Sequence, residues 1–244
     1  MGALDWLVAR PIAHRGLHGP GAVENTATAF AAAIAAGYGI ECDCQVSADG
    51  EAMVYHDDAL GRVTEGSGAL AQTSAAALKT ITFKNTSDRM FTLAELCDLV
   101  GGRVPLLIEL KSHFDGDKRL VERIAAVLAS YRGPVAAMSF DPELVGMLRR
   151  IAPRLARGIV AQRRYSDWVD LPARPRRCMT HMLHLPRTRP HFVAYAIRDL
   201  PAFAPLAMRS ILGMPLLTWT VRTQAEHATA IRWADQMIFE GWCP

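Results

Sequence analysis

Long apolar runs are missing from this sequence, in which no uncharged hydrophobic stretch reaches the roughly 18 residues needed to cross a bilayer. Cysteines are also few: five scattered thiols in 244 residues do not make the framework of a disulfide-rich secreted domain. Residues 1–11 contain Asp5 and Arg10 and no basic segment followed by an apolar one, so we expect no secretory signal. These absences favour a globular cytoplasmic protein without a transmembrane segment.

A strong excess of charge of one sign is absent too. The net charge is +3, half of the residues are hydrophobic and 21% are charged, so a large core can form and global disorder is excluded. The stretch from Arg154 to Arg189 contains nine arginines and only two acidic residues, Asp167 and Asp170. This cluster suits a solvated surface segment or an attraction to an anionic substrate or lipid headgroup, which leaves peripheral membrane contact open. No aromatic platform alternates with these arginines, so we expect no nucleic-acid partner.

Short β-rich runs alternate with helical patterns along most of the chain. The expected strands are Pro11–His14, Ile40–Val46, Pro105–Leu110, Val135–Phe140, Gly158–Ala161, His191–Ala196, Leu216–Val221 and Gln236–Glu240. The expected helices are Thr26–Ala36, Leu93–Val100, Lys118–Ser130, Pro142–Ile151, Leu200–Leu212 and Gln224–Trp233. Helix starts are indicated by a capping box of Thr92 with Glu95 and by Asp141 before Pro142. Strands that alternate with helices predict a parallel sheet, and eight such units in about 250 residues predict a (β/α)8 barrel.

Two stretches interrupt this rhythm within the single domain that we expect over residues 1–244. Residues 57–91 are rich in glycine, serine and threonine, show little periodicity, and are interpreted as an insertion after the second strand. Residues 162–190 are rich in proline and arginine and are interpreted as an irregular segment.

Carboxylates gather at the ends of two expected strands. In Ile40–Val46, Glu41 and Asp43 point to the same face because side chains alternate along a strand. Glu109 and Lys111 likewise share a face at the end of the next strand, where a barrel of this kind carries its active site. Adjacent carboxylates in a barrel interior are costly unless a cation neutralises them. Three carboxylates from two strands can therefore hold one Ca²⁺ or Mg²⁺ ion.

Each of these patterns has a simpler interpretation. Glu-x-Asp on a strand also suits a solvated outer face. Cys42 and Cys44, on the opposite face, offer a thiolate metal site, but no second cysteine pair follows at the spacing of a zinc finger. We therefore expect the two thiols to pack against helices as small apolar side chains.

Two histidines add the chemistry of proton transfer. His14 ends the first expected strand. His56 follows Met53-Val54-Tyr55, in the segment after the strand that carries Glu41 and Asp43. Imidazoles exchange protons near neutral pH, so such a pair can serve as general base and general acid. Arg15, beside His14, supplies a planar fork that suits phosphate oxygens. The other six histidines are expected to be structural.

Taken together, these motifs resemble the glycerophosphodiester phosphodiesterases in order and spacing. The resemblance rests on His14-Arg15-Gly16, Glu24-Asn25-Thr26, Phe30, Glu41-x-Asp43, Asp49-Gly50, His56-Asp57, Thr92-Leu93-x-Glu95, Ile108-Glu109-x-Lys111, Ser139-Phe140 and Trp219-Thr220-Val221. It is dense up to Lys111 and weak over residues 162–190. The sequence departs from the family at Val23, Arg222 and residues 239–242, where Phe-Glu-Gly-Trp replaces Thr-Asp-x-Pro, which leaves the substrate in doubt.

The resemblance implies a TIM barrel that uses one divalent cation, Mg²⁺ or Ca²⁺, to hydrolyse glycerophosphodiesters to glycerol 3-phosphate and an alcohol. It assigns acid/base catalysis to His14 and His56, metal binding to Glu41, Asp43 and Glu109, phosphate binding to Arg15 and Lys111, and the pocket wall to Trp219.

Two alternatives remain at this stage. A phospholipase D-like or C-like relative uses the same constellation on lysophospholipids or other lipid phosphodiesters. A barrel that binds an anion without catalysis requires a broken constellation, and every matched position is intact. The expected partner is a small-molecule phosphodiester, and the sequence carries no signal for an oligomeric state.

Overall fold

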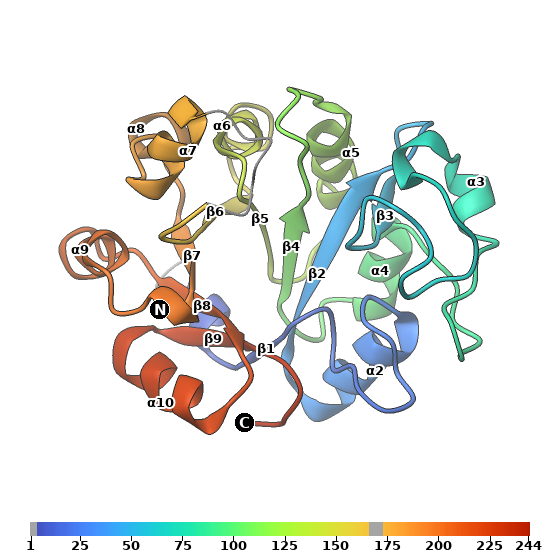
Figure 1. The fold of residues 1–244 in the computed structure, drawn as a ribbon, viewed down its shortest axis with the longest axis horizontal. Helices are drawn as coiled ribbons and strands as arrows, with labels where there is room; N and C mark the ends of the chain where they lie inside the picture. Colours follow the sequence, from blue (N-terminus) through green and yellow to red (C-terminus); the bar gives the residue numbers. More distant parts are fainter. Residues whose placement is uncertain (1–3, 166–172) are drawn as a thin grey trace.

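A closed barrel of strands surrounded by helices forms the centre of the computed structural model, which describes residues 4–165 and 173–244 (Figure 1). Within these ranges, eight strands pair in parallel around the barrel, and β1 closes it by pairing with both β9 and β2. They are β1 (Ile12–Ala13), β2 (Gly39–Val46), β4 (Leu106–Leu110), β5 (Val135–Ser139), β6 (Ala156–Ala161), β7 (Phe192–Ala196), β8 (Leu216–Val221) and β9 (Gln236–Phe239). The short strand β3 (Ala52–Val54) pairs antiparallel with β2. The predicted (β/α)8 barrel is confirmed.

Helices cover the outside of the barrel, as Figure 1 shows. They are α1 (Asp5–Val8), α2 (Ala27–Ala36), α3 (Ala75–Leu78), α4 (Leu93–Val100), α5 (Arg119–Leu128), α6 (Pro142–Ile151), α7 (Ala173–Thr180), α8 (Leu185–Thr188), α9 (Phe203–Leu212) and α10 (Gln224–Trp233), with 3₁₀ turns η1 (Leu70–Gln72) and η2 (Ile197–Asp199). Within the described residues, no helix has both the length and the apolar character needed to cross a membrane.

Local side-chain chemistry sets the start of several helices. Thr92 and Glu95 form the expected capping box, in which Glu95 Oε2 accepts from the Thr92 backbone N–H at 2.9 Å. Asp141 caps α6 by accepting from the Glu143 backbone N–H at 2.8 Å, and Pro142 follows in the first turn. These two helix starts agree with the prediction.

The helix predicted from Leu200 begins later, at Phe203. Pro201 disfavours helical backbone at the residue before it, and Leu200 accordingly has ψ of 141°. The chain forms the short turn η2 before this point.

Helix α1 was not predicted, because four residues are too few to show a helical period. Its buried residue Leu7 packs with Ile12 and Leu107 in the apolar cluster that fills the barrel interior. This contact closes the amino-terminal end of the barrel, which leaves the carboxyl ends of the strands for the polar residues described below.

Residues 57–91 carry a small apolar cluster of their own. Leu70, Leu78, Phe83 and Met90 are fully buried there against Tyr55. In the segment 162–190, the described part contains the short helices α7 and α8, which its proline-rich pattern did not indicate, and residues 166–172 lie outside the described part.

The two faces of β2 have opposite chemistry. Cys42 and Cys44 are completely buried in the cluster between the barrel and its helices, which includes Phe30 of α2 and Leu96 of α4. The expectation that these thiols pack as small apolar side chains is therefore met. Because side chains alternate along β2, Glu41 and Asp43 lie on the opposite, interior face of the strand.

Replacing Cys42 or Cys44 by alanine is expected to lower the free energy of unfolding by about 1 kcal/mol per site, because each change removes one buried heavy atom and leaves a small cavity. Turnover per folded molecule should stay close to wild type, since both thiols face away from the barrel interior. Denaturant unfolding and steady-state kinetics measure the two quantities. A large loss of turnover at constant stability would contradict the assigned face.

Candidate active site

Three carboxylates converge where β2 and β4 run side by side. Asp43 of β2 lies in register with Glu109 of β4, and Glu41 lies two residues before Asp43 on the same face. Ligand oxygens of the three side chains lie within 4.8 Å of one another. Glu41 and Asp43 are 1% exposed and Glu109 is 8% exposed, so water solvates none of them well. The structure thus brings together the three predicted metal ligands.

Two cations contact this acidic cluster. Lys111 Nζ lies 2.8 Å from Asp43 Oδ1 and 2.7 Å from Glu109 Oε1. Arg15 Nε lies 3.1 Å from Asp43 Oδ2, and the Arg15 backbone N–H donates to Glu41 Oε2 at 2.9 Å. Both predicted phosphate-binding residues are therefore anchored beside the carboxylates rather than free in solvent.

The pKa values show an uneven charge balance. Burial, together with the charges of Asp43 and Glu109, raises the pKa of Glu41 well above its usual range. Burial alone would raise the pKa of Asp43, but Lys111 and Arg15 offset it and hold that pKa well below its usual range. The two positive charges of Arg15 and Lys111 balance only two of the three carboxylates, so one negative charge stays uncompensated. A cluster of buried carboxylate oxygens with excess negative charge fits a hard divalent cation such as Mg²⁺ or Ca²⁺.

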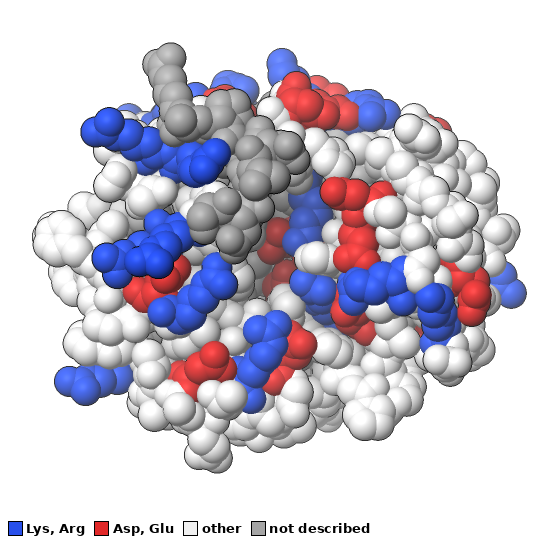
Figure 2. Space-filling view, in the orientation of Figure 1, with Lys and Arg blue, Asp and Glu red and all other residues white. Residues whose placement is uncertain are grey.

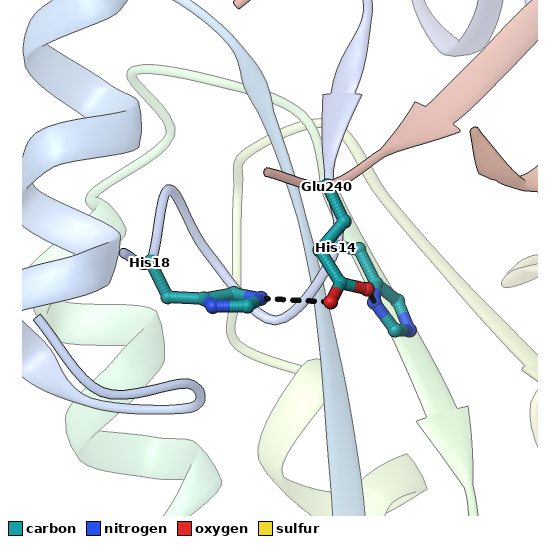
Figure 3. A group of neighbouring side chains, drawn as sticks. All are labelled: His14, His18 and Glu240. Atoms are coloured by element: carbon teal, nitrogen blue, oxygen red, sulfur yellow. Dashed lines mark hydrogen bonds and ion pairs between the residues drawn. The ribbon is translucent and has the colours of Figure 1, made fainter. Parts of the chain in front are cut away.

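His14 stands at the end of β1, beside the end of β9. Its backbone N–H donates to the Phe239 carbonyl at 2.9 Å, and its Nδ1 lies 2.8 Å from Glu240 Oε2. Figure 3 shows the other ring nitrogen pointing away from Glu240. Burial lowers the pKa of His14, and the hydrogen bond with Glu240 acts in the opposite direction.

His56 is paired in the same way with the residue that follows it. His56 Nδ1 lies 2.7 Å from Asp57 Oδ1, and the His56 carbonyl accepts from Gln45 Nε2 at 2.8 Å. Both imidazoles also contribute to lowering the pKa of Asp43, which places the two predicted histidines around the same carboxylate.

Trp219 lies on β8, which is four strands away from β4 in either direction around the barrel. Its Nε1 donates to the Ala194 carbonyl at 3.1 Å, and its ring meets Phe140 edge-on with centroids 5.4 Å apart. The predicted pocket residue is therefore a fixed aromatic surface across the barrel from the acidic cluster.

Several residues at this site were not predicted to be functional. Asn25 donates from Nδ2 to Asp43 Oδ2 at 2.9 Å from a left-handed backbone conformation with φ of 56°, which asparagine tolerates better than most residues. Arg62 bridges Asp57 and Glu24, donating from Nη2 to Glu24 Oε1 at 2.6 Å. Arg62 and Glu24 are 38 residues apart, so no local pattern indicates their contact.

A second group of ligand types lies close by. His14, His18 and Glu240 also have ligand atoms within 4.8 Å of one another (Figure 3). However, this group has a single carboxylate, whose charge Arg222 Nη2 already balances at 2.8 Å from Glu240 Oε2, whereas the other cluster sets three carboxylates against two cationic side chains. The cluster of Glu41, Asp43 and Glu109 is therefore the better cation site.

Charged side chains of both signs line a hollow over the barrel in Figure 2. The carboxyl ends of parallel strands and the loops that follow them are where barrels of this architecture place their sites. The fold and the position of the polar cluster place the protein in the class of (β/α)8 barrels with a site at that face. More narrowly, the chain belongs to the glycerophosphoryl diester phosphodiesterase family, whose model matches residues 14–241. The resemblance found in the sequence is confirmed.

Curated proteins with similar sequences match part of this chain. A glycerophosphodiester phosphodiesterase of Caldanaerobacter subterraneus is 30% identical over 161 residues, which cover 62% of this chain and 66% of that protein. The chain matches just under two thirds of the length of its curated relatives, 65–66%.

Solved structures share the fold over nearly the whole chain. An Oleispira antarctica phosphodiesterase, solved in complex with the product sn-glycerol-3-phosphate, has a TM-score of 0.80 at 21% identity, with 94% of this chain and 92% of that chain covered. A glycerophosphodiester phosphodiesterase of Parabacteroides distasonis has a TM-score of 0.75 at 18% identity, with 94% and 92% covered.

Proposed function

We propose that this protein hydrolyses glycerophosphodiesters to glycerol 3-phosphate and an alcohol, with one divalent cation held by Glu41, Asp43 and Glu109. The observation that carries the proposal is the meeting of these three buried carboxylates within 4.8 Å, with Arg15 and Lys111 in contact with them. Family membership and the glycerol 3-phosphate bound to the Oleispira relative support the same substrate class.

The cation, when bound, neutralises charge that develops on the phosphate oxygens. Arg15 and Lys111 bring fixed positive charge to the same place, because Asp43 already holds both of them in position. Charge that is positioned before the reaction costs no reorganisation during it, which makes this arrangement effective in the transition state.

The two histidines supply the proton transfers. One imidazole removes the proton of the attacking group, either water or a hydroxyl of the substrate, and the other protonates the leaving alkoxide at the opposite side of the phosphorus. Each has a carboxylate at Nδ1, Glu240 for His14 and Asp57 for His56, so Nε2 is the nitrogen available to the substrate.

The test is turnover of a panel of glycerophosphodiesters with different alcohols, measured as release of glycerol 3-phosphate. We expect extensive chelation to abolish turnover, and Mg²⁺ or Ca²⁺ to restore it. Lysophospholipid in the same panel tests the lipid alternative, and its preferential hydrolysis would replace the proposed substrate class. No turnover of any diester with either cation would leave the protein an anion-binding barrel and overturn the proposal.

A further inference from the structure

The carboxylate on His14 comes from a different strand. Residue Glu240 directly follows β9, the neighbour of β1 in the barrel, and its Oε2 lies 2.8 Å from His14 Nδ1. The backbone of the two strand ends is joined as well, since the His14 N–H donates to the Phe239 carbonyl at 2.9 Å. The side-chain contact therefore connects two elements that barrel closure already holds together.

Glu240 is itself held from two directions. Its backbone N–H donates to the Val221 carbonyl at 3.0 Å, and Arg222 Nη2 donates to its Oε2 at 2.8 Å. Arg222 is in turn fixed at the start of α10, where its backbone N–H donates to Glu226 at 2.8 Å. A carboxylate with this support has little freedom to turn away from the imidazole.

The charge state of Glu240 decides which ring nitrogen of His14 carries the proton. The hydrogen bond with His14 lowers the pKa of Glu240 to about 2, so the group is ionised at any pH near neutrality. An ionised carboxylate only accepts hydrogen bonds, so His14 Nδ1 must be the donor. Nε2 of the neutral ring then has its lone pair free and points away from Glu240 (Figure 3).

We infer that Glu240, held by Arg222, is the positioning residue that keeps His14 in the Nδ1–H tautomer and aims its Nε2 at the scissile phosphodiester. The inference rests on the proposed function, because it assigns His14 a proton transfer at that bond. It also accounts for Arg222, one of the positions where the sequence departs from its family. Removing the carboxylate leaves the ring free to rotate and to take the other tautomer, so Nε2 loses the fixed position and protonation state that a proton transfer at that bond requires.

The charges around His14 set the expected pH response. The carboxylates of Glu240 and Asp43 raise its pKa, Arg15 lowers it, and the strongest influence is burial, which also lowers it. His18 faces the other oxygen of Glu240 at 4.0 Å. Loss of the Glu240 charge should therefore move the titration of His14 to lower pH.

The experiment compares Glu240→Gln and Glu240→Asp with a matched control, Glu143→Gln. Glu143 is an exposed carboxylate that pairs with Arg187, so this variant also loses one glutamate–arginine contact but touches no histidine. Kinetics on a glycerophosphodiester are recorded across pH, and the tautomer of His14 is read from ¹⁵N chemical shifts of the labelled imidazole, with His14→Gln for assignment.

We expect Glu240→Gln to lose at least about 10-fold in kcat, which is part of the roughly 10²–10⁴-fold that a proton transfer supplies. The limb of the pH profile that belongs to His14 should move to lower pH, and its ring should no longer be held as Nδ1–H. Glu240→Asp keeps the charge with a shorter reach, so it should keep the tautomer and fall between the glutamine variant and wild type in kcat. Glu143→Gln should match wild type in all three measurements.

Several results would overturn the inference. Wild-type kcat and pH profile in a folded Glu240→Gln protein would do so, as would a wild-type ring of the Nε2–H tautomer. A fall in kcat without movement of the pH limb or the tautomer would show a structural role only. If the glutamine variant does not fold, the tautomer of wild type and Glu240→Asp still decides the point. A wild-type protein that hydrolyses no diester but shows the Nδ1–H ring would instead count against the proposed function.

Discussion

Replacing Glu41 or Glu109 by glutamine is expected to reduce turnover by about 10³-fold or more, since a bound cation contributes several kcal/mol of transition-state stabilisation. Each substitution removes one of three anionic ligands but keeps the size of the side chain. In Glu41→Gln, the amide oxygen can still accept from the Arg15 backbone N–H, so the local structure should persist. Steady-state kinetics with saturating Mg²⁺ or Ca²⁺ measure the loss.

The same substitution of Glu41 should not destabilise the metal-free protein. Because folding raises the pKa of Glu41, its ionised form costs folding free energy at every pH above the ordinary pKa of glutamate. Glutamine removes that cost, so in chelator at neutral pH the free energy of unfolding should equal or exceed that of wild type. Adding the cation should stabilise wild type and leave the variant nearly unchanged.

A surface carboxylate provides the control for this pair of measurements. Glu51 pairs with Arg123 at 2.7 Å outside the barrel, and Glu51→Gln should keep both turnover and the stabilisation by metal. Full turnover after extensive chelation, or wild-type kinetics in Glu41→Gln, would show that these carboxylates hold no catalytic cation.

His14→Ala and His56→Ala should each lose roughly 10²–10⁴-fold on a natural glycerophosphodiester, because an alkoxide leaving group needs both proton transfers. A nitrophenolate ester leaves without a proton. On that substrate, the variant that lacks the acid should recover much of the wild-type rate, while the variant that lacks the base should not. The comparison therefore shows which histidine is the acid and which is the base. The structure does not distinguish them by their partners, because each ring has a carboxylate at Nδ1.

Two further measurements test whether the histidines act as a unit. The double variant should be little worse than the more damaged single variant, since the effects of residues in one catalytic unit do not add. His113→Ala is the control, because His113 is half exposed and lies 3.9 Å from the exposed Asp58. Metal analysis should show the cation retained in every variant. Near-wild-type turnover of the natural diester in either single variant would contradict the paired mechanism.

Local patterns in the sequence were sufficient to predict much of the site. Alternation along a strand is a property of a few consecutive residues, so the placement of Glu41 and Asp43 opposite Cys42 and Cys44 could be read before the fold was known. The parallel arrangement of β2 and β4 then implied that Glu109 and Lys111 meet them at the same end. These inferences needed only the strand period and the rule that parallel strands end together.

Tertiary structure alone decided which residues contact His14 and Glu24. Glu240 reaches His14 because barrel closure brings the last strand beside the first, and Arg62 reaches Glu24 because the insertion folds back over the β1–α2 loop. Neither contact has a local period or spacing, because residues far apart in the chain meet only when the whole sheet closes. The residue types of the candidate site could therefore be recognised in short stretches of sequence, whereas the partner of His14 and the position of Arg62 depend on long-range packing.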